Sequence, residues 1–335
     1  MAVITMADVA KRAGVSKSTV SQYLNKRFDY MGEKTKKRIE QAIEELDYSP
    51  NFVARSLRQK KTMTIGVIVA NILHDFSTQV IRAIEDACHE QDFHVIVCNA
   101  DDEPVKERRY IEMLRAKQVD GIIVFPTSAN VTLYNDLLRE GYPLVFVDRM
   151  VSKVNVNAVI SDNEETVRLA VGEFVAKGYE RIAMVLPSLE QQLSPRVERM
   201  EGYKKALAEY GLPYCPSYLA SGEIEYVQPA FAKMIALESP PQALLAGNDL
   251  VLFEVLEYAK REQMRIPEDI AIIGIDDVSF ANFYNPSLTT VAQPTFEMGK
   301  KAAELLLKQI KNGESSQEEP CVHRFQPTLK RRSSS

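Results

Sequence analysis

The 335-residue sequence lacks the features that mark several large classes of protein. Its longest apolar runs, such as residues 65–73, are much shorter than the ~20 residues that a membrane-spanning helix needs. The first residues are not a signal peptide, because Asp8, Lys11 and Arg12 interrupt any apolar segment there. These absences predict a cytoplasmic protein with no membrane partner.

Cysteine is scarce as well. The chain has four cysteines, and no two of them form a CxxC pair. This spacing fits neither a disulfide framework nor a zinc site. We therefore expect no bound metal and no cofactor.

The sequence motifs of common enzymes are missing too. There is no GxxxxGK[ST] phosphate loop, no GxGxxG, no GxSxG nucleophile elbow and no HExxH pair. The four histidines are dispersed, and the adjacent Asp276 and Asp277 would point apart instead of forming an acid/base pair. The sequence therefore predicts a protein that is not an enzyme and has no catalytic residues.

Charge is spread unevenly along the chain. Residues 1–61 carry 13 Lys and Arg against 7 Asp and Glu, a net charge of +6, whereas the whole chain has a net charge of −5. A basic N-terminal part on an acidic remainder favours contact between the first part and a polyanion. A chance fluctuation in charge is the alternative.

The first 48 residues predict a helix-turn-helix unit followed by a third helix. Thr5 can cap a helix over residues 6–13, Gly14 can end it, and Ser16 can cap the helix that follows. The third helix is expected over about residues 33–46. Apolar residues from all of these helices could close a small core: Val9, Val20, Leu24, Ile39 and Ile43.

The second helix lies within SKSTVSQYLN (16–25) and combines one apolar stripe with a face of short polar side chains. The second helix of such a unit enters the DNA major groove, where Gln22 could bond adenine twice and Lys17 could reach guanine or a phosphate. An ordinary three-helix module with a polar exterior is the alternative. The expected DNA contacts here are Thr5, Lys17, Ser18, Thr19, Ser21, Gln22 and Asn25.

From residue 63 onward, short β-rich runs alternate with helical stretches. This alternation predicts an α/β fold with parallel sheets covered on both faces, and the number of units favours two subdomains. Ligands of such sheets bind beyond the carboxyl ends of the strands, where polar residues follow several runs. The expected strands are 64–70, 93–99, 120–126, 143–149, 181–187, 242–248 and 269–275.

Residues 4–25 (ITMADVAKRAGVSKSTVSQYLN) and 33–58 (EKTKKRIEQAIEELDYSPNFVARSLR) resemble the LacI/GalR family of bacterial transcription regulators. The resemblance extends through the chain. It implies a homodimer that binds a near-palindromic double-stranded operator. It also implies the domain order: helix-turn-helix domain 1–48, hinge helix or linker 49–61, effector-binding N-subdomain 62–160 plus 291–320, and C-subdomain 161–290 plus 321–335, the last two resembling periplasmic sugar-binding proteins.

In this family the hinge is implied to fold on DNA, paired with the hinge of the dimer partner. The expected contacts there are Asn51, Ala54 and Leu57, with Leu57 as an apolar wedge in the minor groove. Without the resemblance, residues 49–61 would be better interpreted as a flexible basic linker than as a helix.

The resemblance also implies a site for a small-molecule effector. Aspartate and asparagine oxygens suit vicinal hydroxyl groups, while arginine can bind a carboxylate or phosphate, so the pattern indicates a sugar or sugar acid. Asp249 is expected to cap the helix that follows it. The expected effector-binding residues are Asn71, Phe76, Asp148, Arg149, Ser161, Arg199, Asn248, Asp276 and Thr295.

Within the family, the KSTVSQYLN helix and the FDYMGEKT turn are most similar to the repressor subgroup that responds to 2-keto-3-deoxygluconate, an acidic sugar of pectin and hexuronate breakdown. The sequence thus predicts a repressor released from DNA by a sugar-acid effector. Two alternatives stay open. One is a regulator that uses a phosphorylated carrier protein as corepressor, and the other is a sugar-binding protein without gene control.

Overall fold

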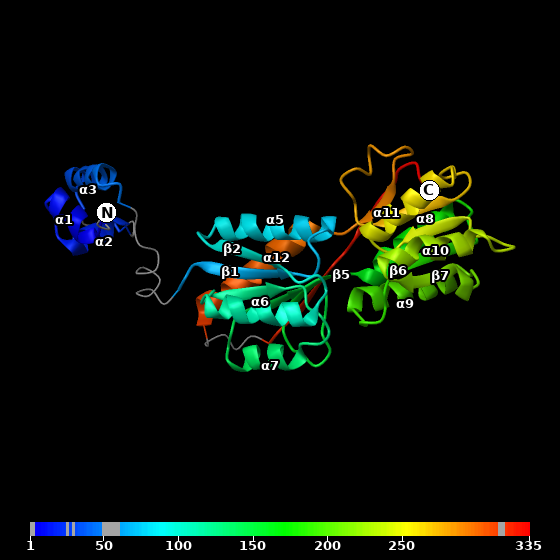
Figure 1. Ribbon diagram of the computed structural model, residues 1–335, viewed down its shortest axis with the longest axis horizontal. Coiled ribbons are helices and arrows are strands. Elements are labelled where there is room, and N and C mark those ends of the chain that lie inside the picture. The colour runs from blue at the N-terminus through cyan, green and yellow to red at the C-terminus, as the bar shows by residue number, and fades with distance from the viewer. Residues whose placement is uncertain (1–3, 25–26, 29–30, 49–60, 314–318) are drawn as a thin grey trace. The chain divides into compact units, whose positions relative to one another are not determined.

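The computed structural model describes residues 4–24, 27–28, 31–48, 61–313 and 319–335 (Figure 1). The chain divides into two compact units, Met1–Thr62 and Met63–Ser335, which we treat one at a time. The predicted hinge helix and the DNA contacts predicted at Asn25, Asn51, Ala54 and Leu57 lie outside the described residues. Within the described part of the chain, no helix is long and apolar enough to cross a bilayer.

The first unit is a helix-turn-helix followed by a third helix, as predicted. Thr5 begins the first helix by donating its N–H and hydroxyl to Asp8 Oδ2, at 2.8 and 2.6 Å. Gly14 ends that helix with a left-handed φ of 65°, which glycine adopts at little cost. Ser16 Oγ accepts from Thr19 N at 3.1 Å. The helices are α1 (Met6–Ala13), α2 (Lys17–Leu24) and α3 (Glu33–Glu45).

The core of this unit is small and fully apolar at its centre. Val9, Val20 and Ile39 are each 0% exposed. Leu24 and Ile43 are partly buried and pack against that cluster. A closed core of this size holds α2 at a fixed angle to α1 and α3, so its outer face is presented as a rigid surface.

The second unit contains two parallel sheets, which confirms the predicted α/β fold class. In the first sheet, helices α5 and α12 cover one face, and α6 and α7 cover the other (Figure 1). Its six strands are in the order β11-β5-β4-β3-β1-β2. The strands are β1 (Thr64–Val69), β2 (His94–Asn99), β3 (Gly121–Val124), β4 (Leu144–Val147), β5 (Asn157–Ser161) and β11 (Val322–Phe325), and the helices are α5 (Asp75–His89), α6 (Pro104–Ala116), α7 (Val131–Arg139) and α12 (Thr295–Asn312).

The second sheet repeats this arrangement in the order β12-β10-β9-β8-β6-β7, with α8 and α9 on one face and α10 and α11 on the other. Only β12 differs in direction, because it pairs antiparallel with β10. The strands are β6 (Ile182–Pro187), β7 (Leu219–Gly222), β8 (Ala243–Ala246), β9 (Ala271–Ile275), β10 (Thr289–Ala292) and β12 (Thr328–Lys330), and the helices are α8 (Asn163–Ala176), α9 (Ser194–Glu209), α10 (Ile224–Ile235) and α11 (Asp249–Arg261).

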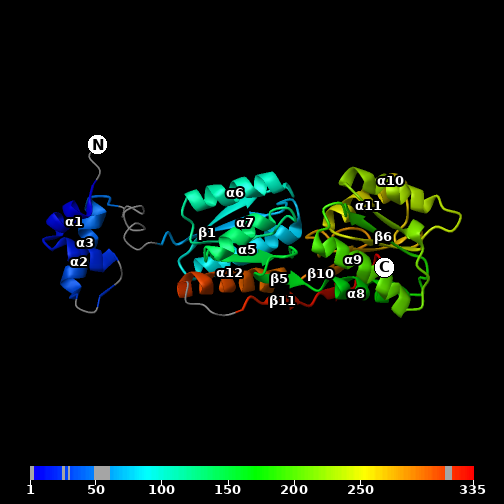
Figure 2. The ribbon, with the colours of Figure 1, turned by 90° about the horizontal axis from the view of Figure 1, so that it is seen from below.

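The chain passes from one sheet to the other after β5, after β10 and after β11 (Figure 2). The predicted boundary at residue 321 is wrong, because β11 pairs parallel with β5 and extends the first sheet, with Val322 opposite Ala158. The last crossing therefore falls between Phe325 and Thr328. Similarly, β10 belongs to the second sheet up to Ala292, so the predicted start of the returning segment at residue 291 comes slightly too early.

The packing of α12 on α5 gives a test of how tightly the first sheet is covered. A Cβ on Gly299 would lie 2.6 Å from Val80 O and 2.7 Å from the Ala83 Cβ. Gly to Ala in an exposed helix stabilises by ~1 kcal/mol, but overpacking costs ~1–3 kcal/mol. We therefore expect Gly299→Ala to lower the thermal unfolding midpoint of the full-length protein in calorimetry. Lys300→Ala, at the exposed next position, is the control, and a raised midpoint for Gly299→Ala would contradict the tight contact.

Candidate functional site

The outer face of α2 carries three of the predicted DNA contacts. Lys17, Ser18 and Gln22 are exposed there. Thr19 is half-buried, and its hydroxyl lies 2.8 Å from Ser16 Oγ. The prediction that Ser21 shares this face is wrong, because Ser21 is only 8% exposed. It follows Val20 directly and lies about 100° from it around the helix, which turns its small side chain toward the core.

Two of the exposed hydroxyl groups already have partners within the unit. The Ser18 hydroxyl lies 2.6 Å from that of Ser16. The Thr5 hydroxyl donates to Asp8, so Thr5 serves the start of α1. Lys17 and Gln22 are therefore the long polar side chains that remain exposed on the outer face of α2.

In the second unit, the carboxyl ends of the strands from the two sheets face a common cavity of about 60 Å³. Six of the predicted effector residues line it: Phe76, Asp148, Arg149, Arg199, Asn248 and Asp276. A second cavity of about 430 Å³, within the size range of small-molecule sites, shares Phe76, Asp276 and Gln293 with the first as lining residues. Both subdomains thus contribute to one region of hollowed surface.

Asp148 and Asp276 occupy corresponding places in the two sheets. Each directly follows a central strand, β4 or β9, and each has a left-handed backbone, with φ of 69° and 80°. The next strand holds each of them, since Asp148 N donates to Val159 O at 2.9 Å and Asp276 N donates to Val291 O at 3.0 Å. A left-handed aspartate is costly and concentrates at functional sites, so the fold retains strain to place both carboxylates.

Arg199 reaches the cavity from α9 and is buried. Its Nε donates to Asn163 Oδ1 at 2.9 Å, and its Nη1 donates to Gly247 O at 2.8 Å. Both acceptors are neutral, so these contacts fix the guanidinium without cancelling its charge. This arrangement suits a group that binds an anion or a row of hydroxyl oxygens.

Asn248, and not Asp249 as predicted, caps α11, because Asn248 Oδ1 accepts from Val251 N at 2.9 Å. Asp249 is instead fully buried and spans the subdomains. Its carboxylate lies 2.5 Å from His74 Nδ1 and accepts from Asp75 N at 2.8 Å. Burial alone would lower the pKa of His74, but the hydrogen bond and charge of Asp249 raise it. The pKa of Asp249 is lowered in turn by His74, against the effect of burial.

The carboxyl group of Asp276 is buried in the cavity and has a raised pKa. Burial, followed by the nearby charge of Asp249, raises the pKa of Asp276 from 3.8 to about 6. Gln293 Nε2 donates to its Oδ1 at 2.6 Å. Among the described residues, neither Gln293 Oε1 nor Ser161 Oγ has a hydrogen-bond partner, although both are buried. Unsatisfied buried groups are uncommon, and here both lie on segments that cross between the sheets.

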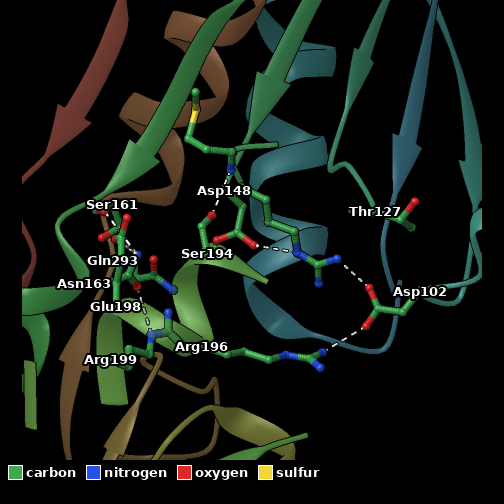
Figure 3. A network of polar contacts seen from close by, with 12 residues as sticks. Asp102, Thr127, Asp148, Ser161, Asn163, Ser194, Arg196, Glu198, Arg199 and Gln293 are labelled. Carbon is green, nitrogen blue, oxygen red and sulfur yellow. Dashed lines mark hydrogen bonds and ion pairs between the residues drawn. The ribbon is translucent and has the colours of Figure 1, made fainter. Parts of the chain in front are cut away.

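Asp102, which was not predicted, lies between two arginines (Figure 3). Its Oδ1 is 2.5 Å from Arg149 Nη1, and its Oδ2 is 3.0 Å from Arg196 Nη2. Arg149 follows β4, whereas Arg196 lies on α9, so the carboxylate bridges the subdomains. Arg149 Nε also lies 3.4 Å from Asp148 Oδ2.

Three predicted effector residues do not line the smaller cavity. Asn71 Oδ1 accepts from Leu73 N at 2.9 Å and holds its own loop. Ser161 is 1% exposed and lines neither cavity, because it ends β5 inside the sheet. Thr295 lines only the larger cavity, with its hydroxyl donating to Gln79 Oε1 at 2.8 Å.

The lining residues that sequence reasoning missed include Arg196 and Gln293. One signal was available for Arg196, which lies three positions before Arg199 and hence on the same side of α9. Gln293 follows β10, a strand too short and too mixed in composition to be predicted. No local pattern marks Asp102, because its partners lie 47 and 94 residues away.

Comparison with known proteins gives consistent matches over the chain. Residues 5–51 match the bacterial regulatory proteins of the lacI family, and residues 171–335 match the periplasmic binding protein-like domain. The chain is 48% identical over 334 residues to the probable HTH-type transcriptional regulator EndR of Paenibacillus polymyxa, covering 99% of this chain and 98% of EndR. It is 33% identical over 312 residues to the HTH-type transcriptional regulator KdgR of Bacillus subtilis (strain 168), covering 91% of each. The structure of the Lac repressor bound to ONPG in its repressed state aligns with a TM-score of 0.85 and 25% identity over 100% of both chains.

The raised pKa of Asp276 predicts a measurable cost of keeping this carboxylate ionised. The folded state binds its proton more tightly than the unfolded state, so stability falls as the pH rises from about 4 to about 6 and stays lower above that. We expect Asp276→Asn to be more stable than the wild type near neutral pH by on the order of 1–3 kcal/mol. The difference should shrink as the pH falls through that range.

Urea unfolding of the full-length protein at several pH values would measure this difference. Asp277→Asn is the matched control and should destabilise, since Asp277 pairs with Arg332 at 2.9 Å. A pH-independent difference between Asp276→Asn and the wild type would contradict the burial argument.

Proposed function

The chain belongs to the lacI family of bacterial regulatory proteins and is a transcriptional regulator, not an enzyme, and on that premise we propose that it is a repressor released from its operator by a sugar-acid effector. The observation that carries the proposal is the cavity between the two sheets, where six residues expected to bind an effector meet. A cavity shared by two subdomains can couple ligand binding to their relative positions, and so to DNA binding.

The operator contact of the proposal rests on α2. Lys17 and Gln22 are exposed on this helix, whose opposite face packs into the apolar core of the three helices. Gln22 is proposed to bond adenine in the major groove and Lys17 to bond guanine or a phosphate. Asn25 and the segment containing Asn51, Ala54 and Leu57 are proposed to complete the contact.

A homodimer is the proposed form, because one helix-turn-helix reads one half of a near-palindromic operator. The second unit also carries apolar side chains at its surface. Leu73 is 73% exposed, Phe283 is 87% exposed and Phe253 is 40% exposed. Ser279 N donates to Asp75 Oδ2 at 3.1 Å. This hydrogen bond joins the loop that carries Phe283 to the segment that carries Leu73. A second copy of the chain is the proposed cover for this surface.

The effector contacts of the proposal follow from the chemistry of the cavity. The carboxylates of Asp148 and Asp276 can accept hydrogen bonds from sugar hydroxyls, and Asn248 adds an amide. Arg199, held by neutral partners, is proposed to bind the acidic group. Together with the similarity of α2 to one subgroup, this makes 2-keto-3-deoxygluconate the proposed effector. The remaining assigned contacts are Arg149, Phe76 and, in the larger cavity, Thr295.

The proposed switch requires that the effector bind the DNA-free conformation more tightly than the DNA-bound one. A difference of roughly 1–3 kcal/mol would be typical for such coupling. By linkage, the operator must weaken effector binding by the same factor.

A panel of metabolites tests the effector proposal directly. We expect 2-keto-3-deoxygluconate to weaken binding of the full-length protein to its operator by roughly 5–150-fold, as measured by fluorescence anisotropy on a duplex selected by the wild-type protein. Neutral sugars and purines should act much less. Arg199→Gln should remove the response, whereas Arg181→Gln, which lies at the opposite end of β6 from the cavity residue Pro187, should retain it. Release by a neutral sugar alone, or only with a phosphorylated carrier protein, would contradict the proposal.

Base reading by α2 has a separate test. Gln22→Arg should shift the preference at one symmetric operator position from adenine toward guanine, because Arg bonds guanine O6 and N7. Selection of binding sites from random duplexes would reveal the shift. Gln41→Arg, on the exposed face of α3, adds the same charge and should change affinity without changing base preference. An identical set of selected sites for the Gln22→Arg variant would rule out base contact at this position.

A further inference from the structure

We propose that Asp102 determines how strongly the cavity prefers acidic over neutral sugars, by acting as an internal counterion to the two arginines that it bridges. This inference rests on the proposed function only in assuming that the cavity binds a sugar. Asp102 is not one of the lining residues, whereas Arg149 and Arg196 are. It therefore acts on a ligand through the charge and the hydrogen-bond donors of these arginines.

The geometry shows that Asp102 uses both of its oxygens on the two arginines. Each carboxylate oxygen contacts one guanidinium group, at 2.5 Å on Arg149 and 3.0 Å on Arg196. The side chains of Arg149, Arg196 and Asp102 are 8%, 16% and 20% exposed, so water screens these contacts weakly. A carboxylate entering the cavity would meet guanidinium groups that already have a counterion.

The backbone of the turn after β2 is strained in a way that places this carboxylate. Asp101 and Asp102 both have left-handed φ angles, 53° and 56°. Asp102 N donates to Ala70 O at 2.8 Å, while Asp101 pairs with Lys106 on the outside of the turn. Two successive left-handed residues that are not glycine are costly, and such strain persists at functional positions.

Three arginines and three carboxylates face one another around the cavity, beside the separate pair of His74 and Asp249. Arg149, Arg196 and Arg199 face the carboxylates of Asp102, Asp148 and Asp276. Burial opposes ionisation of Asp102, but Arg149 and Arg196 outweigh it and lower its pKa, so the carboxylate keeps its charge. Removing this one charge leaves the arginines in excess and should favour an anionic ligand.

The test compares two sugars that differ only at one carbon. D-Glucuronate carries a carboxylate where D-glucose carries a hydroxymethyl group, and both are titrated into full-length protein by calorimetry. We expect Asp102→Asn, which is isosteric, to raise the ratio of glucuronate to glucose affinity by about tenfold or more, equivalent to ~1.4 kcal/mol. Glucuronate binding that appears only in the variant counts as such a rise.

Asp101→Asn is the matched control, since it changes the same residue type in the same left-handed turn and leaves the arginines paired. Its affinity ratio should stay at the wild-type value. Arg196→Gln is a second variant with the opposite expectation, a fall in the ratio, and it decides the question if Asp102→Asn does not fold.

An unchanged or lower ratio in Asp102→Asn, or an unchanged ratio in Arg196→Gln, would overturn the inference. These outcomes are independent of the proposed effector. If 2-keto-3-deoxygluconate fails to release the operator, the proposed function fails, while the glucuronate-to-glucose ratio still decides the role of Asp102.

Discussion

The arrangement of the second unit depends on the crossings that tie its two parallel sheets together. Because the chain passes between the sheets after β5, β10 and β11, the carboxyl ends of both sets of strands meet at one place. Parallel strands end there with backbone groups and short polar loops, which is where ligands of such sheets bind. Each charged contact across the gap, from His74 to Asp249 and from Asp102 to Arg196, follows from that constraint.

The contacts across the gap include two charged pairs, His74 with Asp249 and Asp102 with Arg196, and neutral hydrogen bonds such as that from Met150 N to Ser194 Oγ. A buried apolar interface would fix the two subdomains, whereas paired charges cost desolvation that largely offsets their attraction. The net preference for any one arrangement is then small, and a ligand with a modest difference in affinity can change it. This property suits a regulator in which ligand binding in the cavity is proposed to change the DNA affinity of a separate unit.

Much of the fold could be predicted because its central strands are continuous runs of Val, Ile and Leu, as strands buried on both faces must be. The short outer strands β7, β11 and β12 were missed, since they are partly exposed and mixed in composition. The inner strands β5 and β10 were missed as well, because each has only four or five residues and includes polar ones. Asp148, Asn248 and Asp276 were predicted from their places at the ends of expected strands and from the family resemblance, and all three line the cavity. Ser21 was misplaced because helical spacing alone did not show how far the core extends around α2. The role of Asp102 could not be predicted, because its partners Arg149 and Arg196 come from distant segments of the chain.

The two sheets share one strand order, with β4 and β9 in equivalent positions, and each of these strands is followed by a left-handed aspartate. The cavity is therefore assembled from one structural motif used twice. A pyranose ring, which carries hydroxyl groups around its whole rim, presents similar chemistry to opposite sides. The sugar effector proposed above would therefore meet the Asp148 carboxylate from one subdomain and the Asp276 carboxylate from the other, so one repeated turn supplies hydrogen-bond acceptors on two sides of the ligand.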